Sequence, residues 1–126
     1  MQEGLGRKGL TVIEHSVEKV VSDEKKVKDL VNRGRYEFSR HAEREREADK
    51  ILVRELEDAL TNCEIIEDYP DDPRGPSFLT LGFSAGRPIH AVCSIRTEPE
   101  ELLLITVYDP SKHPYEWMDN YRKRKR

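Results

Sequence analysis

Residues 77–108 read SFLTLGFSAGRPIHAVCSIRTEPEELLLITVY, and this stretch decides the fold. Apolar and polar residues alternate along it with the period of two that is typical of β-strands. The breakers SAGRP (84–88) and TEPEE (97–101) divide it into predicted strands at Ser77–Phe83, Ile89–Arg96 and Leu102–Tyr108. The links, of about five residues, are too short for a parallel crossover, so we expect antiparallel neighbours.

The alternation sorts these strand residues into two predicted faces. One face, expected to form the core under the helices, collects Leu79, Leu81, Phe83, Ile89, Ala91, Cys93, Ile95, Leu103, Ile105 and Val107. The other collects Thr80, His90, Ser94, Arg96, Thr106 and Tyr108 among Phe78, Val92, Leu102 and Leu104. Because this second face mixes polar with apolar groups, we expect it to be partly open, and we expect any site on the sheet to lie there.

The chain before this stretch changes from helical to strand periodicity near Cys63. A further strand is predicted at Glu64–Tyr69, separated from the next by PDDPRGP (70–76). Upstream, Ser22, Ser39 and Asp49 are each predicted to cap a helix, the first ending at Gly34. Residues 10–21 fit a helix or a strand, and we predict a helix. The predicted class is α+β, with N-terminal helices packed on a curved four-stranded antiparallel meander.

Length and charge restrict the kind of protein. A chain of 126 residues predicts one domain, which we place at 10–118 after a flexible leader at 1–9 and before a basic tail at 119–126. Within the end of that domain, Trp117 is the one large residue that could anchor the C-terminal segment to the fold. The formal charge of −3 argues against a dedicated nucleic-acid binder, so any nucleic-acid role needs a local basic site.

Cysteine use and hydropathy indicate the compartment. Cys63 and Cys93 are the only cysteines, no CxxC pair occurs, and the N-terminus has no apolar run typical of a signal peptide. The longest apolar stretch, Leu102–Tyr108, is the length of a strand and far short of the ~18 residues that span a bilayer. We expect a cytoplasmic protein without a membrane partner.

His41 and Arg44 lie one turn apart on the second predicted helix. An imidazole can transfer protons and a guanidinium can stabilise phosphorane charge, so the pair suits metal-independent cleavage of a phosphodiester. The alternative is a packed histidine whose ring nitrogens are hydrogen-bonded.

His90, Thr106 and Tyr108 are predicted to share the polar face of the sheet. Together they could bind a phosphate and supply an acid or a base. Cross-strand hydrogen bonding on a half-exposed sheet explains the same grouping equally well.

Arg74 and Ser77 belong to a glycine-containing loop that enters a strand. Gly75 lets the backbone approach a ligand and Arg74 offers a planar fork for phosphate, although ordinary turn chemistry also explains the loop. The histidines show no metal-ligand spacing and nucleotide-binding glycine motifs are absent, so we expect neither a metal nor a cofactor.

Six segments in order resemble one uncharacterised prokaryotic family. They are Ser39-Arg40-His41-Ala42, Tyr69-Pro70-Asp71-Asp72, Arg74-Gly75-Pro76-Ser77, Leu81-Gly82-Phe83, Arg87-Pro88-Ile89-His90 and Ile105-Thr106-Val107-Tyr108-Asp109-Pro110. The resemblance covers about residues 25–118. The family is a domain of unknown function that often sits beside antitoxins of the MqsA type and is similar in outline to RelE, ParE and BrnT toxins.

The resemblance implies a RelE-like fold, an antitoxin partner and cleavage of RNA through attack by the ribose 2′-hydroxyl. In this chain, residue chemistry would make His41, His90 and Tyr108 the catalytic groups, and Arg44, Arg74, Ser77 and Thr106 the contacts to phosphate or RNA. Two other readings stay open. One is a non-catalytic protein-binding module of the same fold, and the other is a member that has kept the fold and lost the activity.

Overall fold

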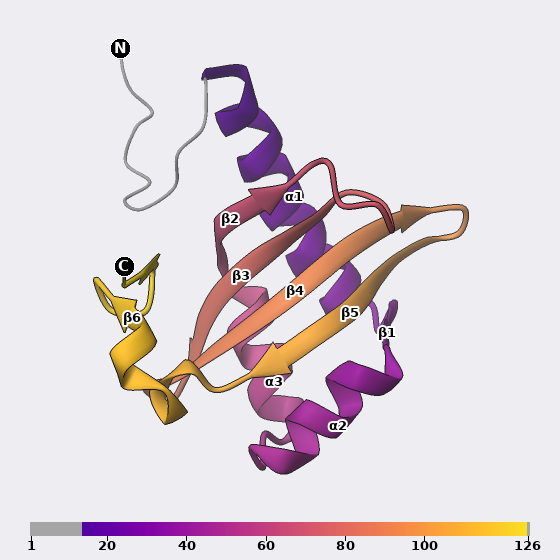
Figure 1. The fold of residues 1–126 in the computed structure, drawn as a ribbon. Coiled ribbons are helices and arrows are strands. Elements are labelled where there is room, and N and C mark those ends of the chain that lie inside the picture. The colour runs from indigo at the N-terminus through magenta and orange to yellow at the C-terminus, as the bar shows by residue number, and fades with distance from the viewer. Residues whose placement is uncertain (1–13, 126) are drawn as a thin grey trace.

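The computed structural model describes residues 14–125, in which three helices pack on a five-stranded sheet (Figure 1). Helices α1 and α3 lie behind the sheet in Figure 1, and α2 lies against β5. The elements are α1 (Glu14–Asn32), β1 (Tyr36–Phe38), α2 (Arg40–Ala48), α3 (Val53–Thr61), β2 (Glu64–Tyr69), β3 (Ser77–Ser84), β4 (Arg87–Thr97), β5 (Glu100–Tyr108), the 3-10 turns η1 (Pro110–Lys112) and η2 (Pro114–Glu116), β6 (Trp117–Met118) and β7 (Lys123–Arg124).

The two helices predicted at 10–21 and from Ser22 onward are one helix, α1, over the residues described. Ser22 does not begin a helix, because the buried stripe of Val20, Val27, Leu30 and Val31 continues across it without a breaker. Gly34 ends the helix as predicted, with φ of +70°, a conformation that glycine adopts without strain. The leader at 1–9 and the start of the segment predicted at 10–21 lie outside the described residues.

Capping matches the prediction at α2 and differs at α3. The Ser39 hydroxyl accepts a hydrogen bond from the Ala42 N–H at 3.0 Å and donates to the Ile105 carbonyl at 2.9 Å, which ties the start of α2 to β5. Asp49 instead follows the end of α2, and α3 begins after Leu52, whose N–H donates to the Glu55 carboxylate. A polar N-cap is therefore not required where a glutamate one turn into the helix accepts the free N–H.

The sheet has five strands in the order β1-β5-β4-β3-β2, so the prediction of a purely antiparallel four-stranded sheet was wrong. Strands β2 to β5 form the predicted antiparallel succession. The missed strand, β1, pairs in parallel with β5 through Tyr36↔Leu102 and Phe38↔Leu104. Three residues are too few to show a period of two, and a parallel pairing between segments so far apart in the chain leaves no local signal.

The predicted division of the sheet into two faces was wrong for β3. Leu81 pairs with His90, and Leu79 pairs with Val92, so the apolar residues of β3 share a face with His90. Phe78, Thr80 and Gly82 instead face the helices. A slip of one residue in register exchanges the two faces of a strand, and alternation within one strand does not fix its register against the next.

β5 departs from strict alternation as well. A β-bulge lies opposite Val92 and Cys93, so that Leu102, Leu104 and Val107 are all buried against the helices. Leu103 and Ile105, predicted to be core, are only partly buried. The bulge adds one residue and thereby shifts the phase of the strand.

The face opposite the helices carries a second apolar cluster formed by Ile66, Leu79, Leu81 and Trp117. Trp117 is 5% exposed, as expected for an anchor of the C-terminal segment. Residues predicted as a basic tail continue this contact, because Arg122 pairs with Glu64 at 3.0 Å and Arg124 with Glu67 at 2.9 Å. The second face is therefore covered over this cluster. No helix within residues 14–125 is both long enough and apolar enough to cross a membrane.

Candidate functional site

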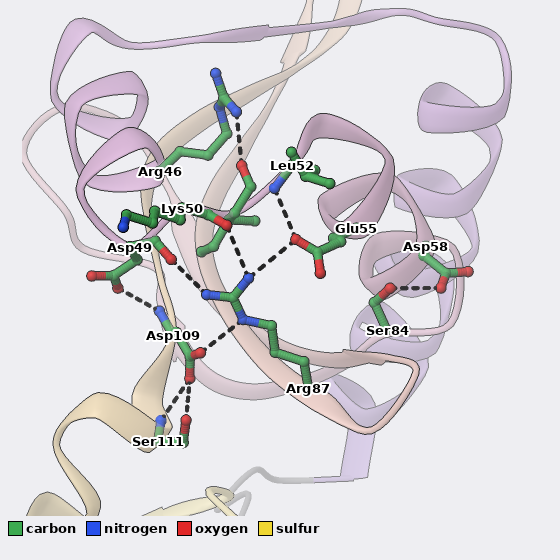
Figure 2. Close-up of polar contacts among 11 residues, drawn as sticks. Arg46, Asp49, Lys50, Leu52, Glu55, Asp58, Ser84, Arg87, Asp109 and Ser111 are labelled. Carbon is green, nitrogen blue, oxygen red and sulfur yellow. Dashed lines mark hydrogen bonds and ion pairs between the residues drawn. The ribbon is translucent and has the colours of Figure 1, made fainter.

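Arg87, at the start of β4, fixes the relative positions of α2, α3 and the end of β5 (Figure 2). Its guanidinium donates to the Asp109 carboxylate at 2.8 Å, to the Glu55 carboxylate at 3.1 Å, and to the carbonyls of Asp49 and Lys50 at 2.6 and 3.1 Å. Burial alone would raise the pKa of Asp109, but hydrogen bonds from Ser111 and Arg87 outweigh burial and lower it. The arginine is therefore a rigid joint between three elements.

The same joint fixes the point at which β5 ends. The Asp109 N–H donates to the Asp49 carboxylate at 2.9 Å, and the Asp109 carboxylate accepts from the Ser111 N–H and hydroxyl. Since Asp109 is 4% exposed, the chain leaves the sheet here along a defined path. Residues beyond η1 are thereby placed next to α2.

His90 and Tyr108, two predicted catalytic residues, lie side by side on β4 and β5 under the C-terminal segment. The Tyr121 carbonyl is 2.9 Å from His90 Nε2 and can only accept, so Nε2 carries the proton. In the neutral ring Nδ1 then accepts from the Tyr108 hydroxyl at 3.0 Å. The rings of Trp117 and His90 meet edge-to-face with their centroids 4.3 Å apart, and the His90 side chain is fully buried, at 0% exposed.

Burial also sets the protonation of this pair. It lowers the pKa of His90 to about 4, although the hydrogen bond to the Tyr121 carbonyl opposes that shift. Burial raises the pKa of the Tyr108 hydroxyl above its ordinary value. Both groups are therefore neutral at pH 7, and each already uses its partner for hydrogen bonding.

Arg74 and Ser77, two predicted phosphate contacts, bind one carboxylate instead. Asp72 accepts from the Arg74 guanidinium at 3.0 Å and from the Ser77 hydroxyl at 2.9 Å, and these bonds, that from Arg74 foremost, lower the pKa of Asp72. Ser77 is 1% exposed, whereas the Arg74 side chain is 70% exposed. β3 separates Ser77 from Leu81, the partner of His90, by four residues or roughly 13 Å.

His41 lies on the exposed side of α2, with its side chain 65% exposed. Its Nε2 is 3.3 Å from Glu45 Oε1, and the same oxygen accepts from the Val107 N–H of β5 at 3.0 Å. A carboxylate bonded to the sheet thus lies within ion-pair distance of an imidazole that solvent can reach, an arrangement also found at general bases. Arg44 is exposed on the same helix.

A groove of about 300 Å³ lies beside this pair, between α2 and the segment after β5. Its walls are Glu45, Ala48, Asp49, Tyr108, His113 and Glu116. His113 has a glutamate partner of its own, Glu116, with Nδ1 and Oε2 at 3.8 Å and both side chains 65% exposed. Two exposed imidazole–carboxylate pairs therefore adjoin one groove.

The structure brings together some of the predicted residues and separates others. His90 and Tyr108 are in contact, Tyr108 lines the groove, and His41 adjoins it through Glu45. Thr106 lies beside them on β5, partly buried, while Arg74 and Ser77 belong to the β2–β3 loop. His113 and Glu45 were not predicted as site residues, and only the return of the chain at Trp117 could have indicated His113. Among residues 14–125, no group of His, Cys, Asp and Glu has the arrangement of a metal site.

Comparison with known proteins gives one result. The family model described as DUF4258, a domain of unknown function, matches residues 38–109. The match runs from Phe38, the last residue of β1, to Asp109, the residue after β5. Helix α1 and the residues after Asp109, including His113, lie outside it. Neither the curated proteins nor the solved structures include a match.

Proposed function

The chain belongs to the DUF4258 family of domains of unknown function, and we propose that it is a metal-independent, toxin-like endoribonuclease acting at the groove beside α2. The observation that supports this proposal is the pair of exposed histidines, His41 and His113, each with a glutamate, beside one groove. Imidazole is the side chain best suited to exchange protons near neutral pH, and two of them can supply both proton transfers of the reaction.

In the proposed reaction His41 removes the proton of a ribose 2′-hydroxyl, and the 2′-oxygen attacks the adjacent phosphorus. The bond from phosphorus to the 5′-oxygen of the next nucleotide breaks, and His113 donates a proton to that oxygen. The products are a 2′,3′-cyclic phosphate and a free 5′-hydroxyl. Glu45 stabilises the imidazolium that forms on His41, and Arg44 stabilises the charge on the phosphorane.

His90, Tyr108, Arg74 and Ser77 have other parts in this proposal than the sequence predicted. His90 and Tyr108 shape the wall of the groove, because their polar atoms are bonded to each other and to Tyr121. Arg74 and Ser77 stabilise the β2–β3 loop through Asp72. A RelE-like fold and an antitoxin partner complete the proposal and rest on the resemblance of the sequence segments, while a cytoplasmic location rests on the use of cysteine and the hydropathy of the sequence.

Cleavage of a single-stranded RNA oligonucleotide by the purified chain tests the proposal. We expect 2′,3′-cyclic phosphate ends, no cleavage when the residue before the cut carries a 2′-deoxyribose, and a loss of about 100-fold or more for His41→Ala and His113→Ala. Arg33→Ala, which removes an exposed arginine directly after α1, is the control and should cleave like the wild type. Intact RNA with the wild type, or equal rates for the wild type and His41→Ala, would contradict the proposal.

A second candidate, a non-catalytic module that binds a basic protein segment, is favoured by the charge of the groove. Three of its six wall residues are carboxylates: Glu45, Asp49 and Glu116. This reading predicts that a lysine- and arginine-rich peptide binds in a calorimetric titration and that Glu116→Gln weakens it, whereas Glu47→Gln, on the exposed side of α2, does not. Cleavage of RNA that depends on His41 would count against it.

A further inference from the structure

Residues 113–125, which we call the C-terminal arm, form a hairpin of their own after the His113 N–H donates to the Pro110 carbonyl at 3.1 Å. β6 pairs with β7 in a two-stranded sheet separate from the main one. The Lys125 N–H donates to the Glu116 carbonyl at 2.8 Å, and the Arg122 N–H donates to the Asp119 carbonyl at 3.1 Å. No strand of the arm pairs with a strand of the five-stranded sheet.

The arm is held on the sheet by side chains and by one backbone carbonyl. Trp117 fills the space over Leu79, Leu81 and Ile66, and the Arg124 guanidinium lies 4.8 Å from the centre of its ring. The Arg122–Glu64 and Arg124–Glu67 ion pairs join the arm to β2, the edge strand. An isolated hairpin is at best marginally stable in water, so the structure of the arm depends on these contacts with the sheet, which we call its seat.

The turn of the arm is strained while it is seated. Asp119, Asn120 and Tyr121 have φ of 53°, 55° and 70°, a left-handed conformation that costs residues other than glycine free energy. This turn aims the Tyr121 carbonyl at His90 Nε2.

We propose that the arm docks on the sheet and leaves it as a unit, with Trp117 as its anchor, and that seating of the arm assembles the groove. His113 and Glu116 belong to the arm, whereas Glu45, Ala48, Asp49 and Tyr108 belong to the fixed domain. An open arm therefore removes one wall of the groove and one of its two imidazoles. The consequence for RNA cleavage rests on the proposed function, but the docking itself does not.

The full chain reports on the arm directly, because Trp117 is its only tryptophan. Urea unfolding of the full chain is followed by tryptophan fluorescence, which reports the seat, and by far-ultraviolet circular dichroism, which reports the helices and the main sheet. We expect the fluorescence midpoint at lower urea than the dichroism midpoint. Coincident transitions in the wild type would overturn the proposal.

Two variants weaken the seat from opposite sides. Arg124→Ala acts on the arm and Glu67→Gln acts on β2, and each should raise the ratio of open to seated arm by about three- to tenfold. Both should move the fluorescence midpoint and leave the dichroism midpoint in place, while the control Arg33→Ala moves neither. Equal movement of both midpoints in the two variants would also overturn the proposal.

RNA cleavage by the same samples separates this inference from the proposed function. Separate fluorescence and dichroism transitions without RNA cleavage would support docking of the arm as a unit and count against the proposed ribonuclease. Cleavage that depends on His41 together with coincident transitions supports the ribonuclease and overturns the arm. With both present, Arg124→Ala should lose cleavage at urea concentrations that open its arm and leave the wild-type arm seated.

Discussion

Burial of His90 makes the free energy of unfolding of this protein depend on pH. Its pKa is about 4 in the folded chain, chiefly because of burial, against an ordinary value of 6.5. Between these values the unfolded chain binds a proton that the folded chain does not. Lowering the pH therefore favours unfolding, and the stability that His90 contributes is complete above about pH 6.5 and is lost progressively toward pH 4 and below.

The size of the effect follows from the same two values. The difference between 6.5 and about 4 corresponds to roughly 3 kcal/mol between pH 7 and pH 4. His90 is 0% exposed, so solvent screening does not reduce this figure greatly. The nearby charges of Glu67 and Asp109 favour the proton and that of Arg124 opposes it, so these contributions partly cancel.

The assay is urea unfolding at a series of pH values for the wild type and for His90→Gln. Carboxylates titrate in both proteins over this range, so the contribution of His90 is the difference between the two pH profiles. We expect the wild type to lose about 3 kcal/mol more free energy of unfolding than His90→Gln between pH 7 and pH 4. Parallel profiles would refute the reasoning, because they would mean that His90 binds a proton equally well in both states.

Two further substitutions test the packing that positions the groove. Arg87→Lys keeps the charge and loses the fork that joins Asp109, Glu55 and two carbonyls, so we expect a loss of about 2 kcal/mol in urea unfolding. Arg96→Lys, at an exposed pair with Glu37, should cost less than about 0.5 kcal/mol, and equal costs would contradict the role given to Arg87. Gly82→Ala should lower the free energy of unfolding by about 3 kcal/mol or more, because the added Cβ atom would lie 2.0 Å from the Ala59 carbonyl oxygen. Ala59→Gly should not rescue it, since the clash is with backbone, and a Gly82→Ala protein of normal stability would refute the close approach of α3 to β3.

Helix ends were predicted correctly where a single residue type has a known local role. The serine before α2 accepts the free N–H of Ala42, and Gly34 adopts the left-handed conformation that ends α1, as the sequence indicates. Antiparallel order among β3, β4 and β5 followed from the lengths of the links between them. These features depend on interactions between residues that are close in the chain, so the local sequence is enough to predict them.

Features that depend on distant segments were not predictable in the same way. The register of β3 against β4 decides whether Leu81 joins Ile89 or His90, and both pairings satisfy alternation. The bulge in β5 then shifts Leu102 and Leu104 onto the helix side, where strict alternation had placed Leu103 and Ile105. Both errors concern phase, which the pattern within one strand cannot fix.

The candidate site shows the same limit at a larger scale. The sequence predicted that His41, Arg74, His90 and Tyr108 carry chemistry, and each residue type supports that view, but convergence depends on the path of the chain after β5. That path is fixed by Asp109, which is bonded to Arg87 and Asp49, and by Trp117, which seats the arm over Leu79 and Leu81. Together they bury His90 and bring His113 beside α2, whereas Arg74 pairs with Asp72 within the β2–β3 loop. The groove thus combines one wall within the family match, which ends at Asp109, with a second wall from residues after that match. A DUF4258 domain without such an arm would therefore expose the sheet face and lack the second imidazole, so activity that survives His113→Ala would place the chemistry in the family domain alone.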